Sequence, residues 1–225
     1  MQQEQNMRAN YCPCDGIDMP KSLDKTLEFY NRNADSFIEN TLYADMHETQ
    51  DRFLDLVKPG GRILDFGCGS GRDTRYFLSH GYQVDAVDGS AELVRKASEQ
   101  LGISVKQQLF QDLSEVDRYD GIWACASILH LPKSELKDVM QKMTTALHDN
   151  GVIYTSFKYG SYEGERNGRY FTDFTEETIR EFLEDMPMLR IRECWVTVDV
   201  RPGRDDEKWL NLILSKAGND RISCQ

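Results

Sequence analysis

Three glycines at alternate positions are the residues of this chain whose spacing most clearly indicates chemistry. Gly67, Gly69 and Gly71 follow the apolar pair Ile63-Leu64, and an amphipathic pattern begins directly after them. This order predicts a buried strand, a tight turn and the start of a helix. Glycine is needed where φ is positive or where a ligand approaches the backbone closely. Because open α/β sheets bind nucleotides at such turns, we expect a nucleotide-like ligand here.

The glycine spacing separates two classes of nucleotide cofactor. A dinucleotide fingerprint reads G-x-G-x-x-G, and its last glycine lets helix and strand pack closely. Here the order is G-x-G-x-G, with Asp65 two residues before the first glycine. A pyrophosphate prefers bare helix-terminal N–H groups, whereas a nearby carboxylate suits a ligand with a cationic group. Asp88 ends the next apolar run, where an acid can accept hydrogen bonds from ribose hydroxyls.

Five stretches of the chain, in this order, resemble the class I S-adenosylmethionine-dependent methyltransferases. They are Ile63–Thr74, Val84–Asp88, Phe110–Leu113, Tyr119–Pro132 and Asn150–Tyr154. The resemblance implies S-adenosyl-L-methionine as cofactor and S-adenosyl-L-homocysteine as product. It also implies an α/β, Rossmann-like fold: a seven-stranded, mostly parallel sheet with its last strand antiparallel, helices on both faces and an N-terminal helical cap.

The same resemblance implies a set of cofactor-binding residues. It assigns Asp65 and the glycine turn to the methionine end of the cofactor, Asp88 to the ribose and Asp112 to the adenine amino group. Tyr30 would close over the methionine end, although plain core packing would also explain it. Singly, Asp88 could be an ordinary strand-end acid and Asp112 an N-cap. The predicted set is Tyr30, Asp65, Phe66, Gly67, Cys68, Gly69, Ser70, Gly71, Arg72, Asp88, Gly89, Ser90, Gln111, Asp112, Leu113 and Ala126.

The candidate catalytic residue is His130. It follows the apolar run Ile122–Ala126, at the edge of the sheet where the transferred methyl group should point. Methyl transfer needs a base only if the nucleophile keeps its proton at neutral pH, because alignment can do much of the work. A histidine that bonds the loop backbone is the competing interpretation.

A second set of residues could shape a substrate pocket. Aromatic and cationic side chains in one segment would suit a planar or anionic acceptor. A solvated loop would explain each of them equally well. They are Lys158, Tyr159, Tyr162, Arg166 and Arg169, with Glu163 and Tyr170 in the same segment.

Composition and charge limit the class of protein. The chain has 225 residues and a net charge of −11, which opposes binding to a phosphate backbone. No apolar run is long enough for a membrane span, and the polar N-terminal residues predict no signal peptide. Cys68 and Cys125 lie in the glycine turn and in an apolar run, so we expect a reduced, cytoplasmic protein. Cys12-Pro13-Cys14 has no second ligand pair, so no metal is predicted.

The alternation of elements predicts one domain. We expect a flexible arm over 1–20, a methyltransferase domain over 21–217 with a helical cap over 21–58 and a substrate-loop insertion over 159–175, and a tail over 218–225. Strands separated by helical patterns imply a parallel sheet. A short turn-rich link joins the last two apolar runs, which favours an antiparallel pair. Strands are expected over 62–67, 82–87, 104–110, 119–126 and 151–158, and helices over 71–80, 90–101, 133–147 and from Thr175 to about 185.

The sequence bears on three other functions. Tyr154 and Lys158 have the Y-x-x-x-K spacing of short-chain dehydrogenases, but they lie in a β-rich run that would separate them by roughly 13 Å. The segment Ala124–Ser127 lacks the [DN]-P-P-[YF] motif that grips a flipped amino base. A protein or tRNA methyltransferase and a non-catalytic cofactor-binding protein stay open. The prediction is methyl transfer to an O, N or S atom of a small molecule; the sequence does not indicate an oligomeric state.

Overall fold

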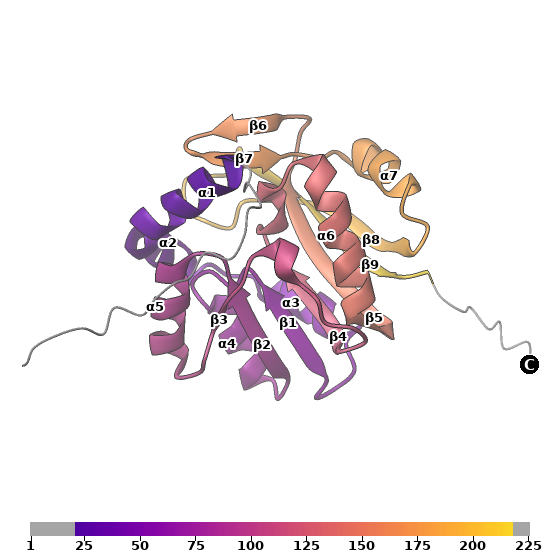
Figure 1. Cartoon of the computed structure of the whole chain (residues 1–225), viewed down its shortest axis with the longest axis horizontal. Helices are drawn as coiled ribbons and strands as arrows, with labels where there is room; N and C mark the ends of the chain where they lie inside the picture. The colour runs from indigo at the N-terminus through magenta and orange to yellow at the C-terminus, as the bar shows by residue number, and fades with distance from the viewer. Residues whose placement is uncertain (1–20, 218–225) are drawn as a thin grey trace, which may run out of the picture.

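The computed structural model describes residues 21–217, and its centre is a seven-stranded sheet in the order β3-β2-β1-β4-β5-β9-β8 (Figure 1). Neighbouring strands β3, β2, β1, β4 and β5 run parallel, and β9 is antiparallel to both β5 and β8. The predicted Rossmann-like sheet, with its last strand reversed, is confirmed. The strands are β1 Arg62–Phe66, β2 Gln83–Asp88, β3 Lys106–Gln107, β4 Tyr119–Ala124, β5 Leu147–Lys158, β8 Leu189–Val198 and β9 Lys208–Lys216.

Helices follow from local signals at their ends. The hydroxyl of Ser90 caps α5, which ends at Gly102 with φ 68°, and Thr175 and Thr178 form a capping box at α7. Pro132 precedes α6, where its missing N–H is not needed. The helices are α1 Lys21–Arg32, α2 Ala34–Thr41, α3 His47–Leu54, α4 Arg72–Ser79, α5 Ala91–Leu101, α6 Lys133–Ala146 and α7 Glu176–Glu184, with 3-10 turns η1 Phe110–Asp112 and η2 Ile128–His130.

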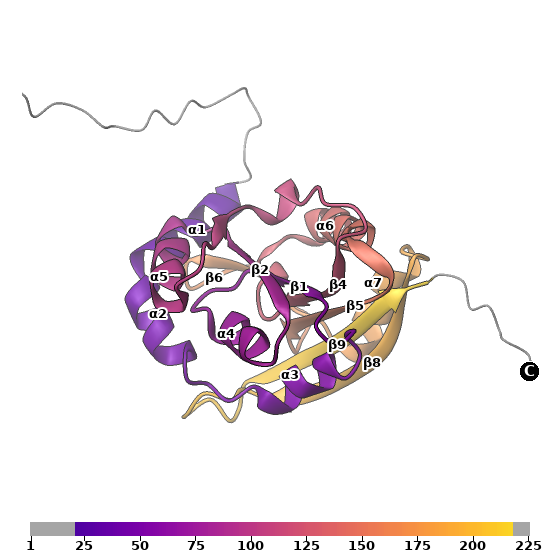
Figure 2. The ribbon, with the colours of Figure 1, turned by 90° about the horizontal axis from the view of Figure 1, so that it is seen from below.

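Alternation along the strands divides the apolar side chains between two main cores. Ile63, Trp123 and Ile213 pack with residues of α3 and α4, whereas their neighbours Leu64 and Ile122 pack with residues of α6 and α7. Figure 2 shows α3 and α4 on the opposite side of the sheet from α6 and α7. The central strands are therefore covered on both faces, as parallel sheets require.

The segment predicted as a substrate-loop insertion contains a regular hairpin. Strands β6 Glu163–Arg166 and β7 Arg169–Thr172 pair antiparallel around the two-residue turn Asn167-Gly168. Both turn residues have positive φ, 50° and 76°, which is the conformation that Asn-Gly favours in two-residue hairpins. This hairpin was not anticipated from the sequence, although Asn167-Gly168 is a local signal for it.

One strand is much shorter than expected. We predicted a strand over 104–110, but β3 holds only Lys106–Gln107, and the chain then leaves the sheet toward η1. This early exit determines which residues reach the edge of the sheet.

The predicted arm over 1–20, including Cys12 and Cys14, and the predicted tail over 218–225 lie outside the described residues. The division into cap, domain and insertion stays a prediction. Within residues 21–217, no helix combines the length and apolar content needed to cross a membrane.

Candidate active site

A cavity of about 1290 Å³ lies over the carboxyl ends of β1, β2, β4 and β5. The helices α1 and α2, the hairpin β6–β7 and the link between β8 and β9 contribute side chains to its wall. Figure 1 shows α1, α2 and the hairpin gathered at one end of the sheet. Segments far apart in the sequence thus enclose the edge at which the glycine turn lies.

The glycine turn has the conformation that its sequence predicted. Gly67, Gly69 and Gly71 have φ of 91°, 54° and 76°. A Cβ added to Gly67 would lie 2.5 Å from the Cβ of Ser127, and one added to Gly69 would lie 2.9 Å from the ring of Phe37. Glycine is thus required both by the backbone and by close neighbours.

Asp88 is fixed at the end of β2. Its carboxylate accepts hydrogen bonds from the backbone N–H groups of Gly69, at 2.9 Å, and Ser90, at 2.8 Å. Burial raises the pKa of the Asp88 carboxyl, and these backbone hydrogen bonds oppose the rise. The carboxylate lines the cavity next to the turn, where a hydroxyl of a bound ligand could reach it.

The next strand end presents different residues from those expected. Gln108, Leu109 and Phe110 line the cavity, and the Oε1 atom of Gln108 is buried without a hydrogen-bond partner. Asp112 is exposed and does not line the cavity. The early end of β3 brings Gln108 to the edge and carries Asp112 away from it.

Several other predicted cofactor residues also lie off the cavity. The amide of Gln111 donates to Glu135, at 2.8 Å, and Leu113 is buried in the core. Phe66, Gly71 and Ser90 do not line the cavity either. The predicted cofactor residues that do line it are Tyr30, Gly67, Cys68, Gly69, Ser70, Arg72, Asp88, Gly89 and Ala126.

Asp65 supports the turn from behind. It is 2% exposed, does not line the cavity, and accepts a hydrogen bond of 2.5 Å from the hydroxyl of Thr74. Burial and the nearby Asp73 raise the pKa of Asp65 to about 8. Asp73 is paired with Arg72 at 2.8 Å, and this pairing holds its pKa below the ordinary value despite burial. The site therefore keeps a neutral acid and an ionised acid beneath the turn.

His130 lines the cavity between two hydrogen-bond partners. Its Nδ1 lies 2.6 Å from the carbonyl oxygen of Tyr170, and its Nε2 lies 2.8 Å from the hydroxyl of Tyr30. A carbonyl only accepts, so Nδ1 carries the proton and Nε2 accepts the Tyr30 hydroxyl. Burial is the main cause that lowers the pKa of His130 to about 4; the charges of Arg169 and Arg166 contribute to the decrease, and the hydrogen bond to Tyr170 opposes it. The imidazole is thus neutral at pH 7, with its basic nitrogen directed to Tyr30.

The hairpin directs one face of its two strands toward the cavity. Arg166, Arg169 and Phe171 line it, whereas Tyr162 does not, and the Tyr162 hydroxyl donates to the carbonyl of Glu165 at 2.7 Å. The predicted substrate residues that reach the cavity are Lys158, Tyr159, Arg166 and Arg169.

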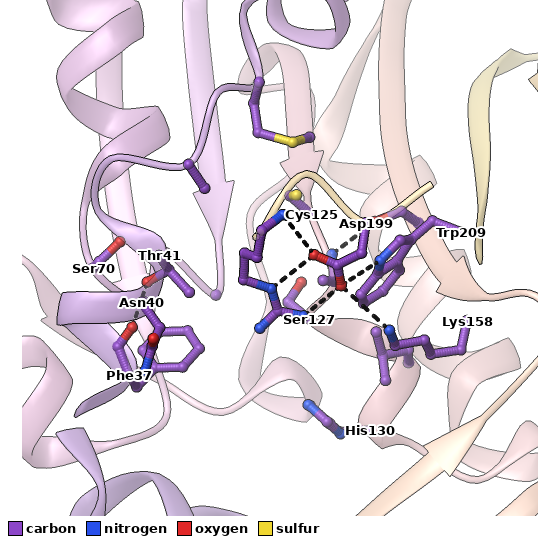
Figure 3. Close-up of a pocket in the computed structure, with 18 of the residues that line it drawn as sticks. Phe37, Asn40, Thr41, Ser70, Cys125, Ser127, His130, Lys158, Asp199 and Trp209 are labelled. Atoms are coloured by element: carbon purple, nitrogen blue, oxygen red, sulfur yellow. Dashed lines mark hydrogen bonds and ion pairs between the residues drawn. The ribbon is translucent and has the colours of Figure 1, made fainter. Parts of the chain in front are cut away.

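The sequence did not indicate an ionic cluster that lines the cavity around Asp199. Asp199 accepts hydrogen bonds from Arg201, at 2.8 and 2.5 Å, and from the indole of Trp209, at 3.0 Å (Figure 3). Burial opposes its ionisation, but these bonds hold the pKa of Asp199 well below its usual range. Lys158 lies over the Trp209 ring at 4.0 Å and pairs with both Asp199 and Glu207. Only the fold reveals this cluster, because its members come from β5, from β9 and from the link between β8 and β9.

The chain is similar in sequence to several methyltransferases. Residues 63–151 match a family model described as a methyltransferase domain. An uncharacterized methyltransferase of Geobacillus kaustophilus is 26% identical over 179 residues, covering 74% of this chain and 82% of that protein. A probable S-adenosyl-L-methionine-dependent methyltransferase TehB of Haemophilus influenzae is 22% identical, covering 76% of this chain and 61% of that protein.

A solved structure shares the whole fold. It is the 1,6-didemethyltoxoflavin-N1-methyltransferase of Burkholderia thailandensis, with 1,6-didemethyltoxoflavin and S-adenosylhomocysteine bound. Its TM-score is 0.72 at 19% identity, covering 90% of this chain and 94% of that chain. Residues 63–151 thus form a methyltransferase domain, and the chain is similar in sequence and in fold to S-adenosylmethionine-dependent methyltransferases. The resemblance seen in the sequence is confirmed, and with it the methyltransferase activity and the cofactor.

The residues around the cavity fit such a cofactor. S-adenosylmethionine offers ribose hydroxyls, an exocyclic amine, a sulfonium and a methionine end with an ammonium and a carboxylate. Asp88 presents acceptor oxygens, the orphaned Oε1 of Gln108 is a free acceptor at the next strand end, and the glycine turn leaves room for close approach. The chemistry of these donors and acceptors therefore matches the ligand that the family uses.

Proposed function

We propose that this methyltransferase acts on a small-molecule acceptor bound beside the cofactor in the roofed cavity. The size of the cavity carries this proposal. Single ligands commonly occupy pockets of about 300–1000 Å³, and this cavity of about 1290 Å³ is larger. It has room for the cofactor and a second compact molecule, and elements of the cap, the hairpin and the β8–β9 link enclose both.

A solved relative of the same fold supports this reading. The Burkholderia thailandensis enzyme is described with a small compound and S-adenosylhomocysteine together. A macromolecular acceptor would need an open approach to the methyl group, whereas here the cap helix α1 is tied to the hairpin. The Thr26 hydroxyl accepts the backbone N–H of Tyr170 at 3.0 Å, and Lys25 pairs with Glu165 at 2.9 Å.

For the cofactor, we propose that Asp88 binds the ribose hydroxyls and that Gln108 accepts the adenine amino group. Gln108 replaces Asp112 in this role because it lines the cavity and has a buried oxygen without a partner. Ala126, which has a left-handed φ of 49°, would direct its backbone to the methionine end. Backbone strain of this kind is held in place only where the surroundings fix it, here by a Ser156 hydroxyl 2.9 Å from the Ala126 nitrogen.

For proton removal, we propose a path through Tyr30 to His130. When bound, the cofactor supplies an electrophilic methyl group on a sulfonium. The acceptor atom gives its proton to the Tyr30 oxygen while Tyr30 passes its own proton to Nε2 of His130. The Tyr170 carbonyl holds the ring in the tautomer that leaves Nε2 free to accept. A nucleophile that is already deprotonated would need only the alignment that the cavity provides.

Transfer of a labelled methyl group tests the class of acceptor. The purified enzyme is incubated with S-adenosylmethionine labelled in its methyl group and with a cell extract divided into small-molecule, protein and nucleic-acid fractions. Label is expected in the small-molecule fraction only. Label in the protein or RNA fraction would contradict the proposal while leaving the methyltransferase family intact.

A further inference from the structure

Arg169 is a half-buried cation of the cavity wall whose charge no carboxylate of the described residues balances. In the described part of the chain, the guanidinium of Arg169 contacts the Tyr30 hydroxyl at 3.4 Å and three aromatic rings, and it pairs with no carboxylate. Its Nε atom is buried without a hydrogen-bond partner. A buried guanidinium N–H without an acceptor is costly, so an acceptor from outside the chain would stabilise it.

The other half-buried cations of the cavity wall have carboxylate partners. Arg166 pairs with Asp173 at 2.6 Å, and Arg72 pairs with Asp73. Lys158 and Arg201 both pair with Asp199. Arg169 is thus the guanidinium that stays available for a single negative charge.

The position of Arg169 is fixed by its surroundings. Its Cζ lies 4.4 Å from the centroid of the Phe29 ring, 5.0 Å from that of Phe171 and 5.7 Å from that of Tyr30. Stacking on aromatic faces holds a guanidinium in place while leaving its N–H groups free to donate in its plane. This geometry suits the bidentate recognition of a carboxylate.

Building on the proposed function, we propose that Arg169 binds a carboxylate group of the methyl acceptor and so makes the enzyme specific for small organic acids. A monoanion matches the single unbalanced charge of Arg169. The contact of Arg169 with Tyr30 places the bound carboxylate next to the pair Tyr30–His130, so the acceptor would be anchored close to the group that takes its proton.

The test uses the wild-type enzyme loaded with S-adenosylhomocysteine and two probes of equal shape, benzoate and neutral benzamide. Calorimetry measures their affinities, and the Nε–Hε resonance of Arg169 in a ¹⁵N spectrum reports contact with the guanidinium. We expect benzoate to bind about tenfold or more tightly than benzamide and to shift the Arg169 resonance. Equal binding of both probes, or no binding while S-adenosylhomocysteine still binds, would overturn the proposal.

Variants separate the acceptor site from the cofactor site. Arg169→Met should abolish the preference for benzoate while leaving the affinity for S-adenosylhomocysteine within about twofold. Arg32→Met is the matched control: it also removes a positive charge from this end of the molecule, but Arg32 is exposed and does not line the cavity. It should leave the preference for benzoate unchanged. Arg169→Lys keeps the charge without the fork and should keep part of the preference, and it serves if the methionine variant does not fold.

Two results point elsewhere. If benzoate competes with S-adenosylhomocysteine and Arg169→Met weakens the cofactor, Arg169 binds the methionine carboxylate of the cofactor and the proposal is wrong. If S-adenosylhomocysteine does not bind to the wild-type enzyme at all, the function itself is contradicted. Benzoate contact with Arg169 is read independently of that result, from the Nε resonance.

Discussion

The imidazole of His130 is held neutral by its environment, and this changes the pH profile expected from its sequence position. Burial lowers its pKa to about 4, although the ordinary value for histidine is about 6.5. Its basic form is therefore present throughout the neutral range. We expect kcat/KM to stay level from neutral pH downward and to fall only as the pH approaches about 4.

Replacement of His130 tests its role. His130→Ala should lower turnover by about 10²- to 10⁴-fold and leave the affinity for S-adenosylhomocysteine nearly unchanged. Tyr30→Phe is the companion variant, because it keeps the ring against Phe37 and removes only the hydroxyl between the acceptor and His130. Near-normal turnover in both variants, with a profile that follows the acceptor's own pKa, would show that alignment alone drives the transfer.

The cofactor residues give a prediction that distinguishes two neighbouring strand ends. Asp88→Ala removes charge-assisted hydrogen bonds to the ribose and should weaken the binding of S-adenosylhomocysteine by about 1–3 kcal/mol. Gln108→Leu should weaken it too, by about tenfold, because the adenine amino group loses its acceptor. Asp112→Ala is the control, since Asp112 is exposed off the cavity. If calorimetry finds that Asp112→Ala weakens the binding of S-adenosylhomocysteine more than Gln108→Leu does, Asp112 is the adenine-binding residue, as the sequence resemblance implies.

At the scale of elements, the hairpin β6–β7 connects the cap to the catalytic segment. The backbone of Tyr170 bonds Thr26 in α1, and the hydroxyl of Thr172 bonds the carbonyl of Leu131, one residue after His130. The carbonyl of Tyr170 also orients the His130 ring. A shift of this hairpin should therefore reach Tyr30, His130 and Arg169 together.

A glycine in the hairpin turn provides the test. Gly168 has φ 76°, so Gly168→Ala should cost about 1–2 kcal/mol of stability through left-handed strain. An added Cβ would also touch the Phe29 ring of α1 at 3.4 Å, so relaxation of the strained turn would shift the hairpin relative to α1. Because small misplacements at a reacting centre are costly, methyl transfer should fall by about 10- to 100-fold.

Gly102 is the matched control for this variant. It has φ 68° at the end of α5, with open space around an added Cβ. Gly102→Ala should lower the thermal midpoint to a similar extent and leave methyl transfer unchanged. Equal losses of activity in both variants would show that the hairpin has no special connection to the site.

The elements also show how far the sequence could predict the site. Positive φ at Gly67, Gly69 and Gly71 is a local property, so their spacing revealed the turn without knowledge of the fold. The hairpin was equally local, and Asn167-Gly168 was a sufficient signal that was not used. The exchange of Asp112 for Gln108 depends on where β3 leaves the sheet, which side-chain periodicity cannot fix over two residues. The cluster around Asp199 and the isolation of Arg169 depend on packing between distant segments.

At the scale of the whole molecule, buried titratable groups make stability depend on pH. His130 has a folded pKa of about 4, below its ordinary value, so between these two pKa values the unfolded chain binds a proton that the folded chain does not. Its contribution to stability is complete above about 6.5 and is lost as the pH falls toward 4. Asp65 has a folded pKa of about 8, above its ordinary value, so the folded chain keeps a proton that the unfolded one loses. Its contribution is complete below about 4 and is lost as the pH rises toward 8.

The two contributions oppose each other between about pH 4 and 6.5, and above about 6.5 only that of Asp65 still changes.

Urea unfolding at several pH values, compared between variants and wild type, separates the contributions of His130 and Asp65. Asp65→Asn mimics the protonated acid, so its stability relative to wild type should rise with pH from about 4 to 8, by at most about 1.4 kcal/mol per pH unit. His130→Asn should gain stability relative to wild type as the pH falls below about 6.5. Asp205→Asn, at an exposed position, is the control for the loss of one carboxylate. If the difference in stability between Asp65→Asn and wild type does not change with pH, Asp65 is ionised in the folded protein. That result would contradict a neutral acid beneath the glycine turn.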